Sequence, residues 1–228
     1  MASIKGISSM ATRLVLGELA AAYTHRSGDA VDIESVGGLD AARRVEAGEP
    51  FDVVFLASSA IDKLVASGCV VEGSQIDLVH SDVAVAVRAG SPRPDIATEG
   101  AVRRAVQEAE TIGYSTGPSG VALTQLFERW GIASEIQPRI VHAPPGVPVG
   151  ELVARGEVAL GFQQLSELMH LEGIDVVGRL PPAIQITTTF SAGLCCASTH
   201  GQEVRRMLDF MGSRAAAEAK RRHGMEPA

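Results

Sequence analysis

The sequence has few cysteines and no surplus of positive charge, and each shortage excludes a class of protein. Its three cysteines, Cys69, Cys195 and Cys196, form no CxxC motif, no metal-ligand spacing and no even framework, so neither a disulfide scaffold nor a metal site is expected. The neighbouring Cys195 and Cys196 are predicted to be buried packing residues in a reducing compartment. Twenty Lys and Arg against 27 Asp and Glu give a net charge of −7, which provides no general attraction to nucleic acid or anionic lipid.

Long apolar runs are missing as well. No stretch approaches the roughly 20 apolar residues that span a bilayer, and residues 1–10 contain no apolar run of signal-peptide length. The chain as it stands is therefore expected to be cytoplasmic, without membrane insertion, and periplasmic if a leader has been removed. A hydrophobic fraction of 46% and a charged fraction of 21% are typical of a globular protein with a packed core.

Short β-branched segments alternate with helical periodicity along nearly the whole chain. Leu16, Leu19 and Tyr23, for example, lie on one face of a predicted helix. Such alternation is typical of the α/β class, in which helices cover parallel strands. Turn-rich segments at 89–98 and at Pro181-Pro182 indicate two boundaries. The predicted lobes are 1–82 plus 192–228, and an inserted lobe at 83–191.

Small polar turns follow four predicted strands, at 6–9, 35–38, 57–59 and 116–120, and each precedes a predicted helix. The first N–H groups of a helix lack internal partners and carry partial positive charge, so an anion is favoured there. The carboxyl ends of parallel strands are also where ligands bind in α/β proteins. One such turn is usually an ordinary cap, but four together favour a shared small anion. The predicted ligand-binding residues in these turns are Ser8, Ser9, Gly37, Gly38, Ser58, Thr116, Ser119 and Gly120.

Motifs of the common enzyme classes are absent. The sequence contains no HExxH, no GxSxG, no GxxxxGK[ST] and no GxGxxG, so no metal and no nucleotide cofactor are expected. His142 ends a predicted strand and would serve as a general base; the alternative is a partly buried histidine satisfied locally. Arg13 lies one turn after Ser9 and would hold a carboxylate through two hydrogen bonds; the alternative is a solvated helix face.

The segments EAGEPFDVVFLAS (46–58) and VARGEVALGF (153–162), together with ISSM and STGPSG, resemble the molybdate-binding type of periplasmic solute-binding protein. This resemblance implies a two-lobed type II fold whose lobes close by a hinge on an anion in the cleft between them. It assigns the ligand contacts to Ser8 or Ser9, to Gly38 and Ser119, to the backbone N–H of Val147, and to Gln164 at the family's tyrosine position. Gly38 lacks the family's hydroxyl and Gln164 lacks its phenol.

These observations favour a protein that binds a small oxyanion or a di- or tricarboxylate. Because relatives of the resembled group include an aconitate isomerase, the alternative is an isomerase that shifts a proton on an unsaturated tricarboxylate, with His142 and Arg13 as base and clamp. A third alternative is an effector-binding module that contacts a transcription or signalling partner, which no DNA-binding segment supports. The expected partner is the small anion alone, since a chain that is not exported does not meet a transporter.

Overall fold

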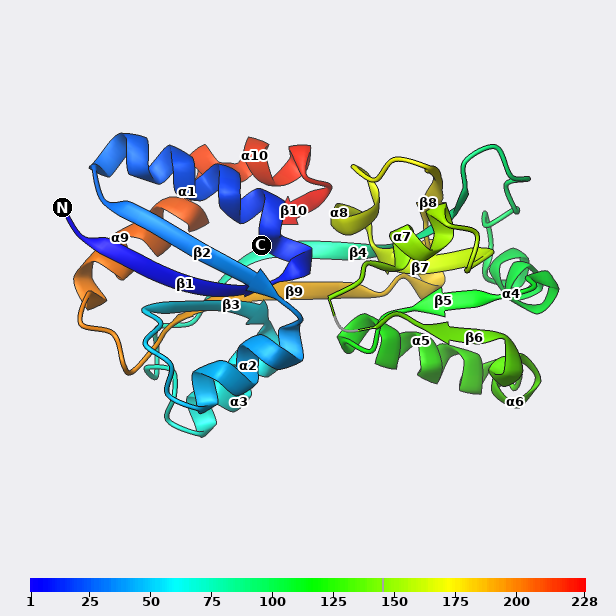
Figure 1. The fold of residues 1–228 in the computed structure, drawn as a ribbon, viewed down its shortest axis with the longest axis horizontal. Coiled ribbons are helices and arrows are strands. Elements are labelled where there is room, and N and C mark those ends of the chain that lie inside the picture. The colour runs from blue at the N-terminus through cyan, green and yellow to red at the C-terminus, as the bar shows by residue number, and fades with distance from the viewer. Residues whose placement is uncertain (145) are drawn as a thin grey trace. The chain divides into compact units, whose positions relative to one another are not determined.

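Two strands, β4 (Ile76–Arg88) and β9 (Thr187–Leu194), run from one structural unit of the chain into the other (Figure 1). The computed structural model describes residues 1–144 and 146–228. Unit 1 comprises Met1–Ser81 and Thr189–Ala228, and unit 2 comprises Asp82–Thr188. The units therefore divide at 81/82 and 188/189, where the sequence predicted 82/83 and 191/192. Both divisions lie inside strands, so no turn marks them.

Unit 1 is built on three parallel strands with β1 (Ser3–Ser9) in the centre. On either side of it lie β2 (Ala30–Val36) and β3 (Val53–Ala57), and β9 pairs antiparallel with β3. The short strand β10 (Met225–Pro227) adds to the unit 1 end of β4. The helical segments are η1 (Met10–Thr12), α1 (Arg13–Ser27), α2 (Gly38–Glu46), α3 (Ser58–Ala66), α9 (Gly201–Gly212), η4 (Arg214–Ala216) and α10 (Ala217–Arg222).

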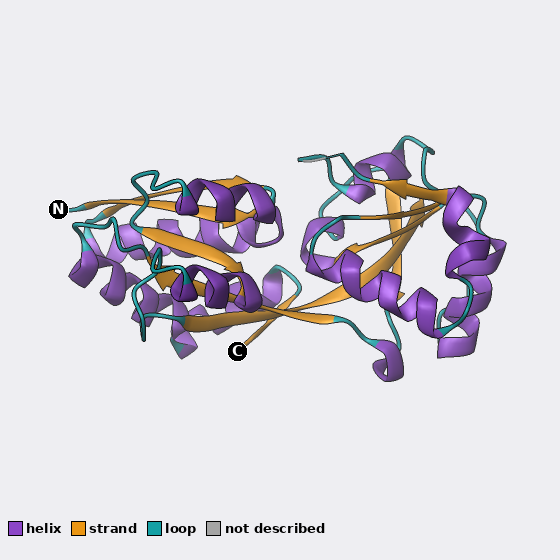
Figure 2. Ribbon diagram, turned by 90° about the horizontal axis from the view of Figure 1, so that it is seen from below, coloured by secondary structure: helices purple, strands orange, loops and turns teal. Residues whose placement is uncertain are grey.

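Strand β3 shows why this sheet needs helices on both faces. All five of its residues are buried. Val53 and Phe55 pack into a core cluster with α1 and α9, whereas Val54 and Leu56 pack into a second cluster with α2 and α3. Side chains alternate between the faces of a strand, so a fully apolar strand requires a cover on each side. Figure 2 shows helices on both sides of the unit 1 strands.

Unit 2 contains its own parallel strands, β6 (Ile140–His142), β5 (Ile112–Tyr114) and β7 (Leu160–Gln164). The unit 2 end of β4 pairs antiparallel with β7 and with β8 (Ile174–Arg179). Its helical segments are α4 (Glu99–Glu108), α5 (Pro118–Arg129), α6 (Ala133–Ile136), η2 (Gln137–Arg139), α7 (Val149–Ala154), α8 (Leu165–Leu168) and η3 (Pro182–Ile184). Phe127 and Phe162 meet edge to face in its core.

The cysteines do not all pack as predicted. Cys195 is buried, but Cys196 is exposed and Cys69 is half-buried. Cys195 forms an antiparallel bridge with Val70 that faces the core, and alternation turns the next residue outward. The prediction of two buried neighbours is therefore wrong for Cys196. Within residues 1–144 and 146–228, every helix is too short or too polar to span a bilayer.

Candidate functional site

Three of the predicted turns meet at one edge of the unit 1 sheet. The register pairs Ser8 with Ser35 on one side and with Phe55 on the other, so β2, β1 and β3 end almost level. A Cβ atom built on Gly38 would lie 3.7 Å from the Cβ of Ser9, which places the start of α2 directly beside the end of β1. The structure thus brings together the unit 1 candidates, which are Ser8, Ser9, Gly37, Gly38 and Ser58.

The two serines at the end of β1 differ in their hydrogen bonding. The Ser8 hydroxyl lies 2.8 Å from the Ser35 hydroxyl and 3.3 Å from the carbonyl oxygen of Ser9. The Ser9 hydroxyl is buried, in a residue only 8% exposed, and has no hydrogen-bond partner among the described residues. Leaving such a group unpaired costs about 1–3 kcal/mol. Among the hydroxyls of Ser8 and Ser9 at this edge, that of Ser9 is therefore better placed to gain from a ligand.

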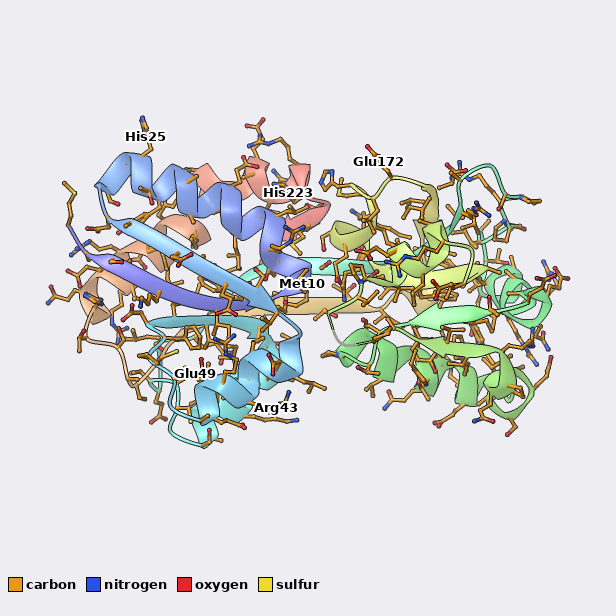
Figure 3. The ribbon with its side chains drawn as sticks, in the orientation of Figure 1. Met10, His25, Arg43, Glu49, Glu172 and His223 are labelled. Carbon is orange, nitrogen blue, oxygen red and sulfur yellow. The ribbon has the colours of Figure 1, made fainter. Side chains whose placement is uncertain are left out.

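The helices that begin at this edge lack side-chain caps. The N-cap residues Gly37 of α2 and Ala57 of α3 make no side-chain cap hydrogen bond. Their first-turn N–H groups keep the partial positive charge that an anion neutralises. Ser9 precedes the 3-10 turn η1, and α1 begins at Arg13. In Figure 3, Met10 marks the point where β1 gives way to this turn.

Arg13 has different surroundings from the serines and glycines at the strand ends. Its side chain is exposed and lines a groove between α1 and β2 that also contains Thr24 and His25. Figure 3 shows His25 at the far end of α1. Arg13 forms no ion pair within the part of the chain that the structure describes. Its role as a carboxylate clamp stays a prediction.

In unit 2, the turn before α5 is shaped by Gly120. A Cβ atom at this position would lie 1.7 Å from the Ser115 carbonyl oxygen, so only glycine permits the chain to fold back this closely. Helix α5 begins with Pro118 at N1, and Gly117 at its N-cap position makes no side-chain hydrogen bond. Ser119, in the first turn, is 7% exposed, whereas Thr116 before the helix is exposed.

Two other predicted residues of unit 2 are less suited to their roles. His142 is exposed at the end of β6, and its ring meets Tyr114 edge to face at 5.2 Å. The backbone N–H of Val147 donates to the Pro144 carbonyl oxygen at 3.0 Å. The structure therefore does not leave Val147 as the free donor that the resemblance implied, because a local turn already uses its N–H. Val147 belongs to the loop 143–147, which includes residue 145, and that residue lies outside the described residues.

Gln164 ends β7 with a half-satisfied amide. Its Nε2 donates to the Thr188 hydroxyl at 2.9 Å, while its Oε1 is buried without a partner among the described residues. A protonated carboxyl or a hydroxyl of a ligand would pair with this oxygen. If the side-chain amide of Gln164 is flipped by 180°, Oε1 accepts from the Thr188 hydroxyl and the Nε2 N–H groups become free for an anion.

Sequence reasoning missed a carboxyl group in unit 2. Gln163 accepts a hydrogen bond from the backbone N–H of Gly150 at 3.2 Å and donates from Nε2 to Glu167 Oε1 at 2.8 Å. Burial raises the pKa of Glu167 to about 7, although the Gln163 hydrogen bond acts in the opposite direction. The only signal in the sequence is the i, i+4 spacing of Gln163 and Glu167. No group of three or more potential metal ligands occurs in residues 1–144 and 146–228.

The structure thus describes one cluster of candidate residues in unit 1 and a second group in unit 2. The binding of one ligand by both groups of residues stays a prediction.

The raised pKa of Glu167 predicts a pH-dependent stability. The folded protein binds this proton more tightly than the unfolded chain, so the stabilisation is fully present below pH 4.5 and is lost as the pH rises through about 7. Between pH 4.5 and pH 8, the free energy of unfolding of the unsubstituted chain should therefore fall by about 2–3 kcal/mol relative to that of Glu167→Gln. Urea unfolding across this pH range measures the difference. The exposed Glu172, labelled in Figure 3, supplies the control Glu172→Gln. Parallel pH profiles for Glu167→Gln and the unsubstituted chain would contradict the prediction.

Comparison with known proteins places this geometry in a family. A family model described as bacterial extracellular solute-binding protein matches residues 4–226. An aconitate isomerase from Pseudomonas sp. is 40% identical over 216 residues, which is 92% of this chain and 82% of the relative.

Solved structures agree on the fold. The periplasmic molybdate-binding protein of Azotobacter vinelandii superposes with a TM-score of 0.80 at 21% identity, over 97% of this chain and 98% of that one. The sulfate-binding protein SubI of Mycobacterium tuberculosis gives 0.79 at 16% identity, over 100% and 88%. The predicted fold class and the resemblance to solute-binding proteins are confirmed. The chain belongs to the bacterial extracellular solute-binding protein family.

Proposed function

We propose that this chain binds a small polycarboxylate anion at the strand-end turns. The observation that carries the proposal is the buried, unpartnered hydroxyl of Ser9 beside the uncapped start of α2. A carboxylate oxygen accepts from such a hydroxyl and from first-turn N–H groups at the same time. Each helix start contributes about 0.3–1 kcal/mol at an exposed site and up to about 2 kcal/mol when partly buried.

The residues present favour a carboxylate over molybdate. The resemblance to the molybdate-binding type assigns Gly38 and Gln164 to positions of a serine hydroxyl and a tyrosine phenol. The amide of Gln164 retains an unsatisfied polar atom, which suits a ligand that offers both donors and acceptors. Among the relatives, the aconitate isomerase is 40% identical, whereas the molybdate-binding protein is 21% identical. The comparison therefore supports an unsaturated tricarboxylate as the ligand.

Each unit supplies candidate contacts for carboxylates. In unit 1 these are the uncapped starts of α2 and α3 and the Ser9 hydroxyl. In unit 2 they are the uncapped start of α5, Ser119 and Gln164.

A thermal-shift panel tests the anion class. We expect aconitate and citrate to raise the melting temperature, because a ligand at 100 times its Kd stabilises a fold by about 2.7 kcal/mol, or roughly 5–10 °C for a chain of this size. Molybdate, tungstate, sulfate and phosphate are compared at equal ionic strength. Ser119→Asp should abolish the shift by placing a negative charge at α5, while Ser134→Asp, at an exposed serine of α6, should retain it. Equal shifts for all anions, or no shift for any of them, would contradict the proposal.

A second function, isomerisation of the bound tricarboxylate, is favoured by the 40% identity to an aconitate isomerase. In this reaction a base removes a proton from the methylene carbon of aconitate. The C–H electron pair forms a new double bond to the central carbon, while the pair of the old double bond moves to the former vinyl carbon. Reprotonation at the former vinyl carbon completes the shift, so no atom or electron is gained or lost. Helix starts that bind the carboxylates would also stabilise the negative charge that develops. His142 is the candidate base and Arg13 the candidate clamp.

Proton NMR of aconitate in D₂O separates catalysis from binding. An isomerase should interconvert cis- and trans-aconitate and introduce deuterium at carbon, and His142→Gln should slow this by about 100-fold if His142 is the base. An unchanged aconitate spectrum beside a positive thermal shift would show that the chain binds without catalysis. Full activity in His142→Gln would remove His142 from the mechanism.

A further inference from the structure

Cys69 and Cys196 lie opposite each other on two neighbouring segments of unit 1. Val70 and Cys195 form an antiparallel bridge, flanked by hydrogen bonds from Val71 N to Leu194 O at 2.8 Å and from Cys196 N to Cys69 O at 2.9 Å. One residue along from the bridge, Cys69 therefore faces Cys196. Opposed residues of this kind have Cα atoms about 5.5 Å apart, which lies within the roughly 4.4–6.8 Å that a disulfide spans.

Burial shows that the two thiols share the outer face. Val70 and Cys195 are 2% and 3% exposed, whereas Cys69 is half-buried and Cys196 is exposed. This is the alternation expected when opposite residues point to the same side of a ladder. Both thiols can therefore be reached by a reagent from solvent.

The third cysteine is a poor competitor. Burial raises the pKa of Cys195 to about 12, and the nearby charges of Asp52, Cys196 and Cys69 act in the same direction. The thiolate is the reactive form of cysteine, so Cys195 contributes little to exchange near neutral pH.

We propose that Cys69 and Cys196 form a redox-sensitive pair that closes to a disulfide when the protein meets a disulfide oxidant, such as oxidised glutathione or a thiol–disulfide oxidoreductase. One thiolate attacks the oxidant and displaces its first thiol. The other thiolate then attacks the mixed disulfide and displaces the second thiol. Two protein thiols are oxidised to one S–S bond, one oxidant disulfide is reduced to two thiols, and the protons pass to the released thiols.

The position of this pair gives its closure a consequence. The covalent loop would contain residues 70–195. This range includes both connecting strands, β4 and β9, and the whole of unit 2. Joining Cys69 to Cys196 would fix the unit 1 ends of both connections. Restriction of the unfolded chain should raise the melting temperature on the order of 5–10 °C, and a reductant should reverse the effect.

Thiol counting on the full chain tests the proposal. After incubation with oxidised glutathione, the denatured protein should present one thiol in place of three, with a mass loss of two hydrogens and a cross-linked peptide pair containing Cys69 and Cys196. Cys195→Ser should still close, whereas Cys69→Ser and Cys196→Ser should not. The melting temperature of each variant in reductant confirms that it folds.

Three outcomes would overturn the proposal. The first is retention of all three thiols under oxidant, and the second is glutathione adducts without a protein cross-link. The third is a cross-link that involves Cys195. None of these results depends on which ligand the chain binds.

Discussion

The register of β1 between β2 and β3 is the constraint on which the candidate site depends. Pairing of Ser8 with Ser35 and Phe55 makes the three strands end level, so that η1, α2 and α3 begin at one edge. The Ser8–Ser35 hydroxyl contact fixes this register at the edge itself. A slip by one residue would reverse every side chain of β1, exchanging the Ile7 and Ser8 environments and turning the Ser9 hydroxyl away from α2. The apolar faces of β1 and β3 make such a slip costly.

The candidate site offers dipoles more than opposite charges. The chain carries a net charge of −7, and the groups gathered at the unit 1 edge are backbone N–H groups and hydroxyls. Neutral donors keep their strength across the physiological pH range, so pH dependence enters from elsewhere. The carboxyl of Glu167 is the candidate for that effect, because its hydrogen bond to Gln163 connects it to the first turn of α7.

Local patterns in the sequence predicted the local parts of this structure. Alternation of β-branched and helical segments indicates the α/β class, and small polar residues mark the turns that the sheet then aligns. Features that arise from long-range contacts left no such signal. The unit boundaries lie inside continuous strands, and the raised pKa of Glu167 results from burial in the folded chain. Cys196 is adjacent to Cys195 in the sequence, but it is exposed and Cys195 is buried, because successive side chains of a strand point to opposite faces.

A comparison of Ser8→Ala with Ser9→Ala, by calorimetric titration with aconitate, tests the central claim most directly. The Ser8 hydroxyl already has partners, so Ser8→Ala should lower stability by about 1 kcal/mol and leave the affinity nearly unchanged. The Ser9 hydroxyl has none in the described residues, so Ser9→Ala should weaken binding by about tenfold without loss of stability. Binding by Ser9→Ala as tight as that of the unsubstituted chain would contradict the account.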